Sequence, residues 1–199
     1  MKNKRDRLFF TLLFVPQASQ SSWDRRAELD VFHATPSAQS ACGMEDFMKV
    51  VDMHCDTIAA LYENKEKGWT LQDNGLHIRL DKMKQGDYLL QNFALFVCIE
   101  NCEDPYQQAL TLADCFDRQM ALFPEQIGQV RCYNDILENQ KNGRMSALLT
   151  IEEGAVCQGS LEKLREFYDR GVRMLTLTWN FPNEIGFPNF AISGDGKPD

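Results

Sequence analysis

The feature that most constrains the fold is a series of short, nearly continuous apolar runs, each followed by a helical pattern. Such a run is typical of a strand that is buried on both faces of a parallel sheet. The runs that we interpret as strands are 49–53, 89–99, 145–151 and 172–178. Alternation of strands with helices predicts an α/β fold with a parallel sheet and helical crossovers.

Four segments between and after these runs have the apolar spacing and the end signals of helices. Pro105 and Pro124 bound the second, while glycines end the other three. Asn134 and Ser160 are the N-caps that we expect for the third and fourth. In the fourth, we expect Leu161, Leu164, Phe167 and Tyr168 to share the buried face. The four predicted helices cover 57–67, 105–123, 135–142 and 161–170.

The first strand runs into the triplet His54-Cys55-Asp56. Alternate residues of a strand project on the same side, so His54 and Asp56 point together and Cys55 points the opposite way. An imidazole nitrogen and a carboxylate oxygen suit Zn²⁺ or a similar divalent ion. The triplet alone also fits a turn in which Asp56 caps the helix that begins at Thr57.

Two glutamates, Glu152 and Glu153, directly follow the strand over 145–151. A carboxylate at the end of a buried strand costs free energy unless a cation pairs with it, and a metal would supply that charge. Glu152 could also bridge two metal ions. In the alternative, either carboxylate is solvated and caps the following turn. Because chemistry in parallel α/β folds sits at the C-terminal ends of strands, we expect the triplet, Glu152 and Trp179 to lie there.

Composition excludes some classes of protein and leaves others open. The 199 residues carry a formal net charge of −8, which disfavours a nucleic-acid partner. The number of cysteines is odd and they form no C-x-x-C pair, so we expect reduced, mostly buried thiols in a cytoplasmic protein. The cysteines are Cys42, Cys55, Cys98, Cys102, Cys115, Cys132 and Cys157.

The first 47 residues differ from the rest and are predicted to be a disordered leader. Basic residues precede an apolar run over 8–15, which resembles a weak secretory signal, so a secreted protein is the alternative location. Eight residues are too few to span a bilayer, and no transmembrane segment is expected. His33 lies in this leader and His77 in a short apolar segment. Neither has neighbouring ligands, and we expect neither to bind metal.

Four motifs in this order resemble the membrane (renal) dipeptidases, the M19 metallopeptidases, and particularly their bacterial members. They are Val-Asp-Met-His-Cys-Asp-Thr at 51–57, Gln-Asn-Phe-Ala-Leu-Phe at 91–96, Leu-Thr-Ile-Glu-Glu-Gly at 149–154 and Gly-Val-Arg-Met-Leu-Thr-Leu-Thr-Trp-Asn at 171–180. The last, continued by Asn-Glu-Ile-Gly at 183–186, is the most specific. The resemblance runs from about residue 48 to the last residue.

The resemblance implies a (β/α)₈ barrel of the TIM type with two zinc ions that hydrolyses dipeptides. It implies that His54 and Asp56 bind one zinc and that Glu152 bridges the pair. A metal-bridging hydroxide would then attack the peptide carbonyl, and the complete enzyme could be a homodimer. No catalytic residue beyond these metal ligands follows from it.

The sequence departs from the family pattern at three points. Glu153 stands where many relatives have glycine, and it brings a second acid near the site. Trp179 stands where the renal-type enzymes have a substrate-contacting histidine, which leaves packing or substrate binding as its role. The third departure is that the family's other two ligands are histidines beyond the strand that ends before Trp179, and the chain ends before them.

We therefore expect residues 48–199 to form the N-terminal half of a dipeptidase barrel, with about four of its eight strands. Alone, this chain is expected to bind zinc poorly and to hydrolyse no dipeptide. One alternative is a truncated, inactive barrel fragment. Another is a related metal-dependent barrel of the amidohydrolase type, because a His-x-Asp triplet at the first strand is shared among such barrels.

Overall fold

The computed structural model describes residues 49–188, which form one parallel sheet with helices packed against it. The predicted leader, with His33 and Cys42, lies outside the described residues, so the location of the protein stays a prediction. All four predicted strands are present, and a short fifth strand occurs between the second and third. The strands are β1 (Val50–Asp52), β2 (Tyr88–Phe96), β3 (Ile127–Val130), β4 (Met145–Glu152) and β5 (Val172–Thr176).

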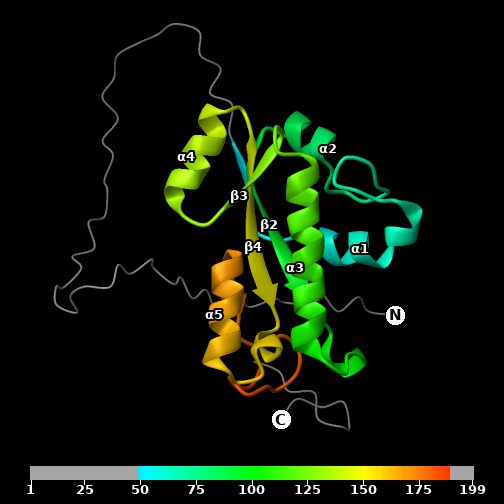
Figure 1. Ribbon diagram of the computed structural model, residues 1–199, viewed down its shortest axis with the longest axis vertical. Helices are drawn as coiled ribbons and strands as arrows, with labels where there is room; N and C mark the ends of the chain where they lie inside the picture. The colour runs from blue at the N-terminus through cyan, green and yellow to red at the C-terminus, as the bar shows by residue number, and fades with distance from the viewer. Residues whose placement is uncertain (1–48, 189–199) are drawn as a thin grey trace, which may run out of the picture.

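Strand β4 lies at the centre of the sheet. β2 pairs along its full length, from Leu90 opposite Ser146 to Phe96 opposite Glu152. Two strands pair with β4 on the side opposite β2: β3 pairs with residues 145–148 and β5 pairs with residues 149–152. β1 extends the sheet beyond β2, and every pair is parallel, so the arrows of β2 and β4 point to the same end in Figure 1.

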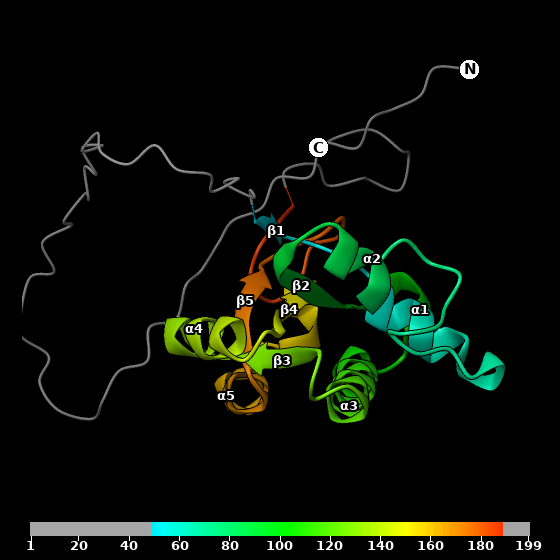
Figure 2. The ribbon, with the colours of Figure 1, turned by 90° about the horizontal axis from the view of Figure 1, so that it is seen from above.

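α3 and α5 lie against the same side of this sheet in both views (Figures 1 and 2). The bounds of the helices are α1 (Thr57–Glu63), α2 (Leu80–Gln85), α3 (Pro105–Leu122), α4 (Tyr133–Lys141) and α5 (Leu161–Arg170), with short 3₁₀ helices η1 (Lys65–Lys67), η2 (Ile99–Asn101) and η3 (Gly154–Cys157). Burial of apolar residues of α1, α2, α3 and α5 against the rest of the fold supplies much of its stability.

The core lies between the sheet and α3. Phe93 of β2 meets Phe116 of α3 with ring centroids 5.9 Å apart, and both side chains are fully buried. Phe167 of α5 is also fully buried, and its ring meets Tyr106 of α3 edge-on. The stripe of apolar residues predicted for 105–123 therefore packs as core.

The predicted bounds of four elements were wrong by two residues or more. The helix predicted over 57–67 ends at Glu63, and residues 65–67 form η1. β2 ends at Phe96 because the chain then turns into η2, although the apolar run continues to Ile99. α4 begins at Tyr133, with Cys132 as its N-cap in place of Asn134, because Asp135 Oδ2 accepts hydrogen bonds from the amides of residues 131 and 132 at 2.6 and 2.9 Å. β5 ends at Thr176, two residues before the end of the predicted strand.

The buried face predicted for α5 was also wrong in part. Leu161 is 76% exposed, whereas Phe167 is buried. At 3.6 residues per turn, these two residues lie about 120° apart around the helix. Because Phe167 points at the sheet, Leu161 must point away from it.

Strand β3 was not predicted, since Ile-Gly-Gln-Val is short and half polar. It depends on a close contact, because a Cβ atom at Gly128 would lie 2.3 Å from Asn139 Oδ1. Asn139 Nδ2 donates to the Gly128 carbonyl at 3.0 Å and to Ser146 Oγ at 3.2 Å. A buried amide of α4 thus joins β3 to β4, which no local pattern indicates.

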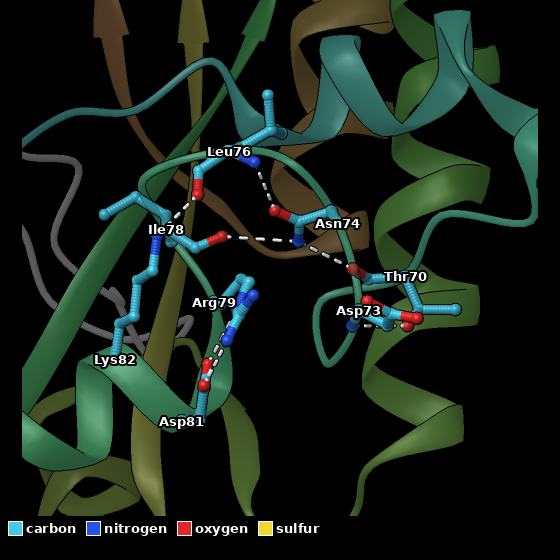
Figure 3. A network of polar contacts seen from close by, with 8 residues as sticks. All are labelled: Thr70, Asp73, Asn74, Leu76, Ile78, Arg79, Asp81 and Lys82. Carbon is cyan, nitrogen blue, oxygen red and sulfur yellow. Dashed lines mark hydrogen bonds and ion pairs between the residues drawn. The ribbon is translucent and has the colours of Figure 1, made fainter.

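His77 lies in a loop that a buried asparagine organises (Figure 3). Asn74 Nδ2 donates to the Thr70 carbonyl at 2.7 Å, and Asn74 Oδ1 accepts from the Leu76 amide at 2.8 Å. Leu76 and Ile78 pack against the core, while His77 between them is exposed. The loop thus directs His77 to solvent.

The cysteines in the described part of the chain are free thiols. Cys115 and Cys157 are buried, and the other four described cysteines are partly exposed, so the expectation of mostly buried thiols is wrong for those four. Within residues 49–188, we find no helix that has the length and hydrophobicity needed to cross a bilayer.

Candidate metal centre

The segment after β1 is fixed by the backbone of β2. The Cys55 amide donates to the Asn92 carbonyl at 3.1 Å, and the Ala94 amide donates to the Cys55 carbonyl at 3.0 Å. The Asn92 side chain adds a bond from Nδ2 to the Met53 carbonyl at 3.1 Å. His54 is therefore held on both sides by hydrogen bonds to its neighbours in the chain.

Cys55 points away from His54 and Asp56, as the strand period predicts. It packs against the hydrophobic core, and burial raises the pKa of its thiol to about 11. The thiol is protonated at neutral pH, so it is a poor metal ligand.

Glu152 is the last residue of β4, with its neighbours fixed by the sheet register. Its Cα atom is paired with Phe96 of β2 on one side and Thr176 of β5 on the other. Paired residues of parallel strands project their side chains to the same face of the sheet. The Glu152 side chain is only 6% exposed, so its carboxylate is not solvated and that alternative is wrong.

The structure brings His54, Asp56 and Glu152 together at the C-terminal edge of the sheet. His54 Nε2 lies 3.4 Å from Asp56 Oδ2 and 3.3 Å from Glu152 Oε2. One ligand atom from each residue lies within 4.8 Å of the others. Asp56 is the N-cap residue of α1, but its side chain makes no capping bond. The carboxylate faces His54 instead, so the helix-cap interpretation of Asp56 is wrong.

The electrostatics of this cluster favour a cation. The hydrogen bond that protonated His54 donates to Asp56 raises the pKa of His54, burial opposes that rise, and the charge of Glu152 supports it. Burial raises the pKa of Glu152, and the charges of Asp56 and Glu153 add to the rise while His54 opposes it. The His54 shift reflects the carboxylates around it, and the Glu152 shift reflects first the burial of a carboxylate and then the nearby acids. A bound cation would stabilise the charged form of both carboxylates.

The donor set also fits a divalent metal. One imidazole nitrogen and two carboxylate oxygens are ligands that zinc accepts, and three protein ligands leave a coordination position open for a water or a substrate. That His54, Asp56 and Glu152 bind metal stays a prediction, which the geometry supports. His77 is exposed and belongs to a different loop, so it is not part of this cluster.

Glu153 has a different environment from Glu152, although the two are adjacent. It is fully buried, and its backbone has a φ of 90°, a value that suits glycine. Oε1 accepts from the Ala155 amide at 3.0 Å and from Asn183 Nδ2 at 2.6 Å, and Oε2 accepts from the Trp179 amide at 3.3 Å. The carboxylate caps a turn, which was the alternative left open for either glutamate, but it is buried rather than solvated. The second acid lies near the site without entering the cluster.

Trp179 lies in an aromatic group at the same edge of the sheet as the cluster. Its ring packs edge-on against Phe96, with centroids 4.9 Å apart, and against Phe181 at 6.3 Å. Phe96 is the β2 neighbour of Glu152, so Phe96 and Trp179 form an apolar wall next to the carboxylate. We refer to Phe96 and Trp179 together as the aromatic wall.

Sequence reasoning missed three residues of this region. Phe96 and Asn92 lie within a strand that reads as continuous core, and Asn183 lies in an irregular segment. The one available signal was Asn92, because a polar side chain in an apolar strand needs a hydrogen-bond partner. Nothing in the sequence indicates which partner that is.

Comparison with known proteins gives consistent results. Residues 39–191 match the family model of the membrane dipeptidases, peptidase family M19. An uncharacterised dipeptidase of Schizosaccharomyces pombe is 30% identical over 168 residues, which cover 76% of this chain and 40% of that protein.

Two solved structures share the fold. Dipeptidase AC, a metallopeptidase of family M19, has a TM-score of 0.61 at 22% identity, over 69% of this chain and 45% of its own. A metallopeptidase from Rhodobacter sphaeroides, solved with a phosphinate mimic of the dipeptide L-Ala-D-Ala, has a TM-score of 0.60 at 21% identity, over 75% of this chain and 52% of its own. The predicted α/β fold of the TIM-barrel type is confirmed, and this chain covers part of it.

The chain thus spans about half, or less, of the length of these relatives. The family match nevertheless includes every strand, the cluster at the sheet edge and the aromatic wall. This chain therefore belongs to the membrane dipeptidase family, peptidase family M19.

Proposed function

We propose that this chain supplies the first half of the active site of a zinc-dependent dipeptidase. His54 and Asp56 bind one zinc ion, and Glu152 bridges it to a second whose remaining ligands lie outside residues 49–188. The observation that carries this proposal is the convergence of the three side chains in a chain of the M19 family.

Each ligand has a distinct part in the proposed site. His54 donates the lone pair of Nε2 and must be neutral to do so, while Asp56 and Glu152 contribute negative charge. When bound, zinc ions supply a water of lowered pKa as nucleophile and polarise the carbonyl that is attacked. The buried position of Glu152 excludes bulk water from one side of the site, which strengthens its electrostatic interactions.

The proposed substrate is a dipeptide. The Rhodobacter sphaeroides relative was solved with a mimic of L-Ala-D-Ala, which supports this class of substrate for the family fold. The aromatic wall lies next to Glu152 and offers a contact for an apolar side chain of the substrate. Trp179 has no titratable proton, so its role is binding, and Trp179→Ala should raise KM more than it lowers kcat.

Two forms of the protein test this proposal: the 199-residue chain, and a form completed to the length of the M19 relatives. We expect the completed form to contain zinc, by mass spectrometry of the native protein, and to hydrolyse an L-Ala-containing dipeptide. We expect the shorter chain to bind zinc poorly and to be inactive. His54→Ala should abolish both properties of the completed form.

His77→Ala is the matched control, because it removes an exposed histidine that is outside the cluster. It should leave zinc content and hydrolysis unchanged. Hydrolysis that persists in His54→Ala, or robust zinc-dependent turnover by the 199-residue chain alone, would contradict the proposal.

A further inference from the structure

The segment after β5 is folded by one asparagine. Asn183 Nδ2 donates to the Leu177 carbonyl at 2.8 Å, and Asn183 Oδ1 accepts from the amides of Ile185 and Gly186 at 2.8 and 3.2 Å. These bonds close residues 177–186 into a compact turn that carries Trp179. The same Nδ2 donates to Glu153, so the turn is joined to the end of β4 through a carboxylate.

Glu153 joins this turn at a second point, the backbone of Trp179. Its two carboxylate oxygens accept different hydrogen bonds: Oε1 accepts from the Ala155 amide and Asn183 Nδ2, and Oε2 accepts from the Trp179 amide. A buried carboxylate that accepts three hydrogen bonds is well satisfied, and such charge-assisted bonds are among the strong ones in proteins. One side chain thus sets both the position of the turn and that of Trp179.

The backbone at Gly154 also lies close to the turn over residues 177–186. A Cβ atom at Gly154 would lie 2.5 Å from the Leu177 carbonyl oxygen and 2.6 Å from Ile185 Cδ1. The chain after β4 therefore approaches the turn more closely than any residue with a side chain permits. Glu153 itself keeps a φ of 90°, which is unfavourable for a residue other than glycine and is tolerated here because its carboxylate is held on the turn.

We propose that Glu153 is a positioning residue, whose carboxylate fixes the Trp179 backbone and thereby holds the aromatic wall beside Glu152. Its significance for catalysis rests on the proposed function, in which Trp179 contacts the dipeptide. Glu153 itself touches neither metal nor substrate.

Glu153→Gln is the sharpest test, because it keeps the shape of the side chain and one acceptor oxygen. If that oxygen still accepts from Ala155 and Asn183, the new NH₂ group faces the Trp179 amide, and two donors cannot bond to each other. The Trp179 amide should then exchange its proton about tenfold faster or more, measured by NMR on the 199-residue chain. With Trp23 and Trp69 replaced by Phe, Trp179 fluorescence should shift to longer wavelength and be quenched more readily by acrylamide.

Glu184→Gln is the matched control, since Glu184 is exposed, lies in the same turn and carries the same charge. It should leave the Trp179 amide and its emission unchanged, and amides within β4 should keep their protection in both variants. Because neither readout involves metal or hydrolysis, the result is independent of the dipeptidase proposal.

Glu153→Gly is the second variant, because glycine accepts the φ of 90° and only the carboxylate is lost. It should give the same faster exchange and the same shift in emission. A folded Glu153→Gln or Glu153→Gly protein with an unchanged Trp179 signal would overturn the proposal. Global unfolding of both variants would overturn it as well, since the role of Glu153 would then extend to the whole fold.

Discussion

Two segments at the same edge of the sheet are held in different ways. Residues 53–56, which carry His54 and Asp56, are held mainly by backbone hydrogen bonds to β2. Residues 177–186, which carry Trp179, are held by the side chains of Glu153 and Asn183. Backbone bonds survive most substitutions, whereas side-chain bonds depend on single residues. The proposed metal ligands should therefore be positioned robustly, and the aromatic wall should be sensitive to individual changes.

Glu152 and Glu153 are adjacent in the sequence, but their side chains belong to different parts of this edge of the sheet. Glu152 is the last residue of β4, so the register directs its side chain toward the face that Phe96 and Thr176 share. Glu153 is the first residue beyond the strand, and its φ of 90° turns the chain so that the carboxylate enters the turn after β5. The same chemical group thus serves as a candidate metal ligand in one position and as a structural tether in the next.

The largest effect is expected for Glu152→Gln, which removes the buried carboxylate of the cluster. Loss of a ligand should lower zinc affinity by more than about 100-fold, since even outer-shell substitutions cost roughly 10–100-fold. Because the 199-residue chain is expected to bind zinc poorly, affinity would be measured on a form of the relatives' full length, by competition with a chromophoric chelator. In a form of the relatives' full length, hydrolysis should be abolished.

The same substitution should increase the stability of the metal-free protein, although it lowers zinc affinity. Burial raises the pKa of Glu152, which means that the folded protein disfavours its charged form. Glu152→Gln should therefore raise the melting temperature of the metal-free chain. Glu138→Gln, on the exposed face of α4, is the control and should change neither quantity. Unchanged zinc affinity in Glu152→Gln would show that the cluster is not the metal site.

An intermediate effect is expected for Gly154→Ala, which acts on the contact between the chain after β4 and the turn over residues 177–186. The added Cβ atom would overlap the Leu177 carbonyl oxygen, which is backbone and cannot rotate away. Overpacking of this kind costs about 1–3 kcal/mol, measured by urea unfolding. Gly186→Ala is the matched control in the same turn, because no atom lies within 4 Å of its Cβ position. Equal stabilities of the two variants would contradict a close approach at Gly154.

Sequence patterns were sufficient for the elements that follow a regular period. The strands predicted over 89–99 and 145–151 and the helix predicted over 105–123 are present with different ends, because apolar spacing is a local signal and the ends of elements are not. The cluster was predicted because His54 and Asp56 are two residues apart and strand ends in parallel sheets converge. Glu152 was a candidate because its carboxylate follows a buried strand, and the resemblance to M19 peptidases implied that it bridges two zinc ions.

The remaining features depend on contacts between distant residues, which no local pattern encodes. β3 is held by the Asn139 side chain, which donates a hydrogen bond to the Gly128 carbonyl. The Asn92 side chain donates to the Met53 carbonyl, 39 residues away in the sequence. The separate roles of Glu152 and Glu153 depend on one backbone angle. Residue type predicted that both were acids near the site, and only their geometry distinguishes them.

The smallest effect is expected for Asn92→Leu, which removes the side-chain hydrogen bond from β2 to the Met53 carbonyl, next to His54. The bonds between the Cys55 backbone and β2 remain, so zinc affinity should fall by less than about tenfold. Asn92 Oδ1 is also a buried acceptor without a hydrogen bond in the described part of the chain, and its removal offsets part of the cost. His54→Ala is the reference for complete loss of the ligand. If Asn92→Leu lowered zinc affinity as much as His54→Ala, this side chain rather than the backbone would position the ligands, and both regions would depend on single residues.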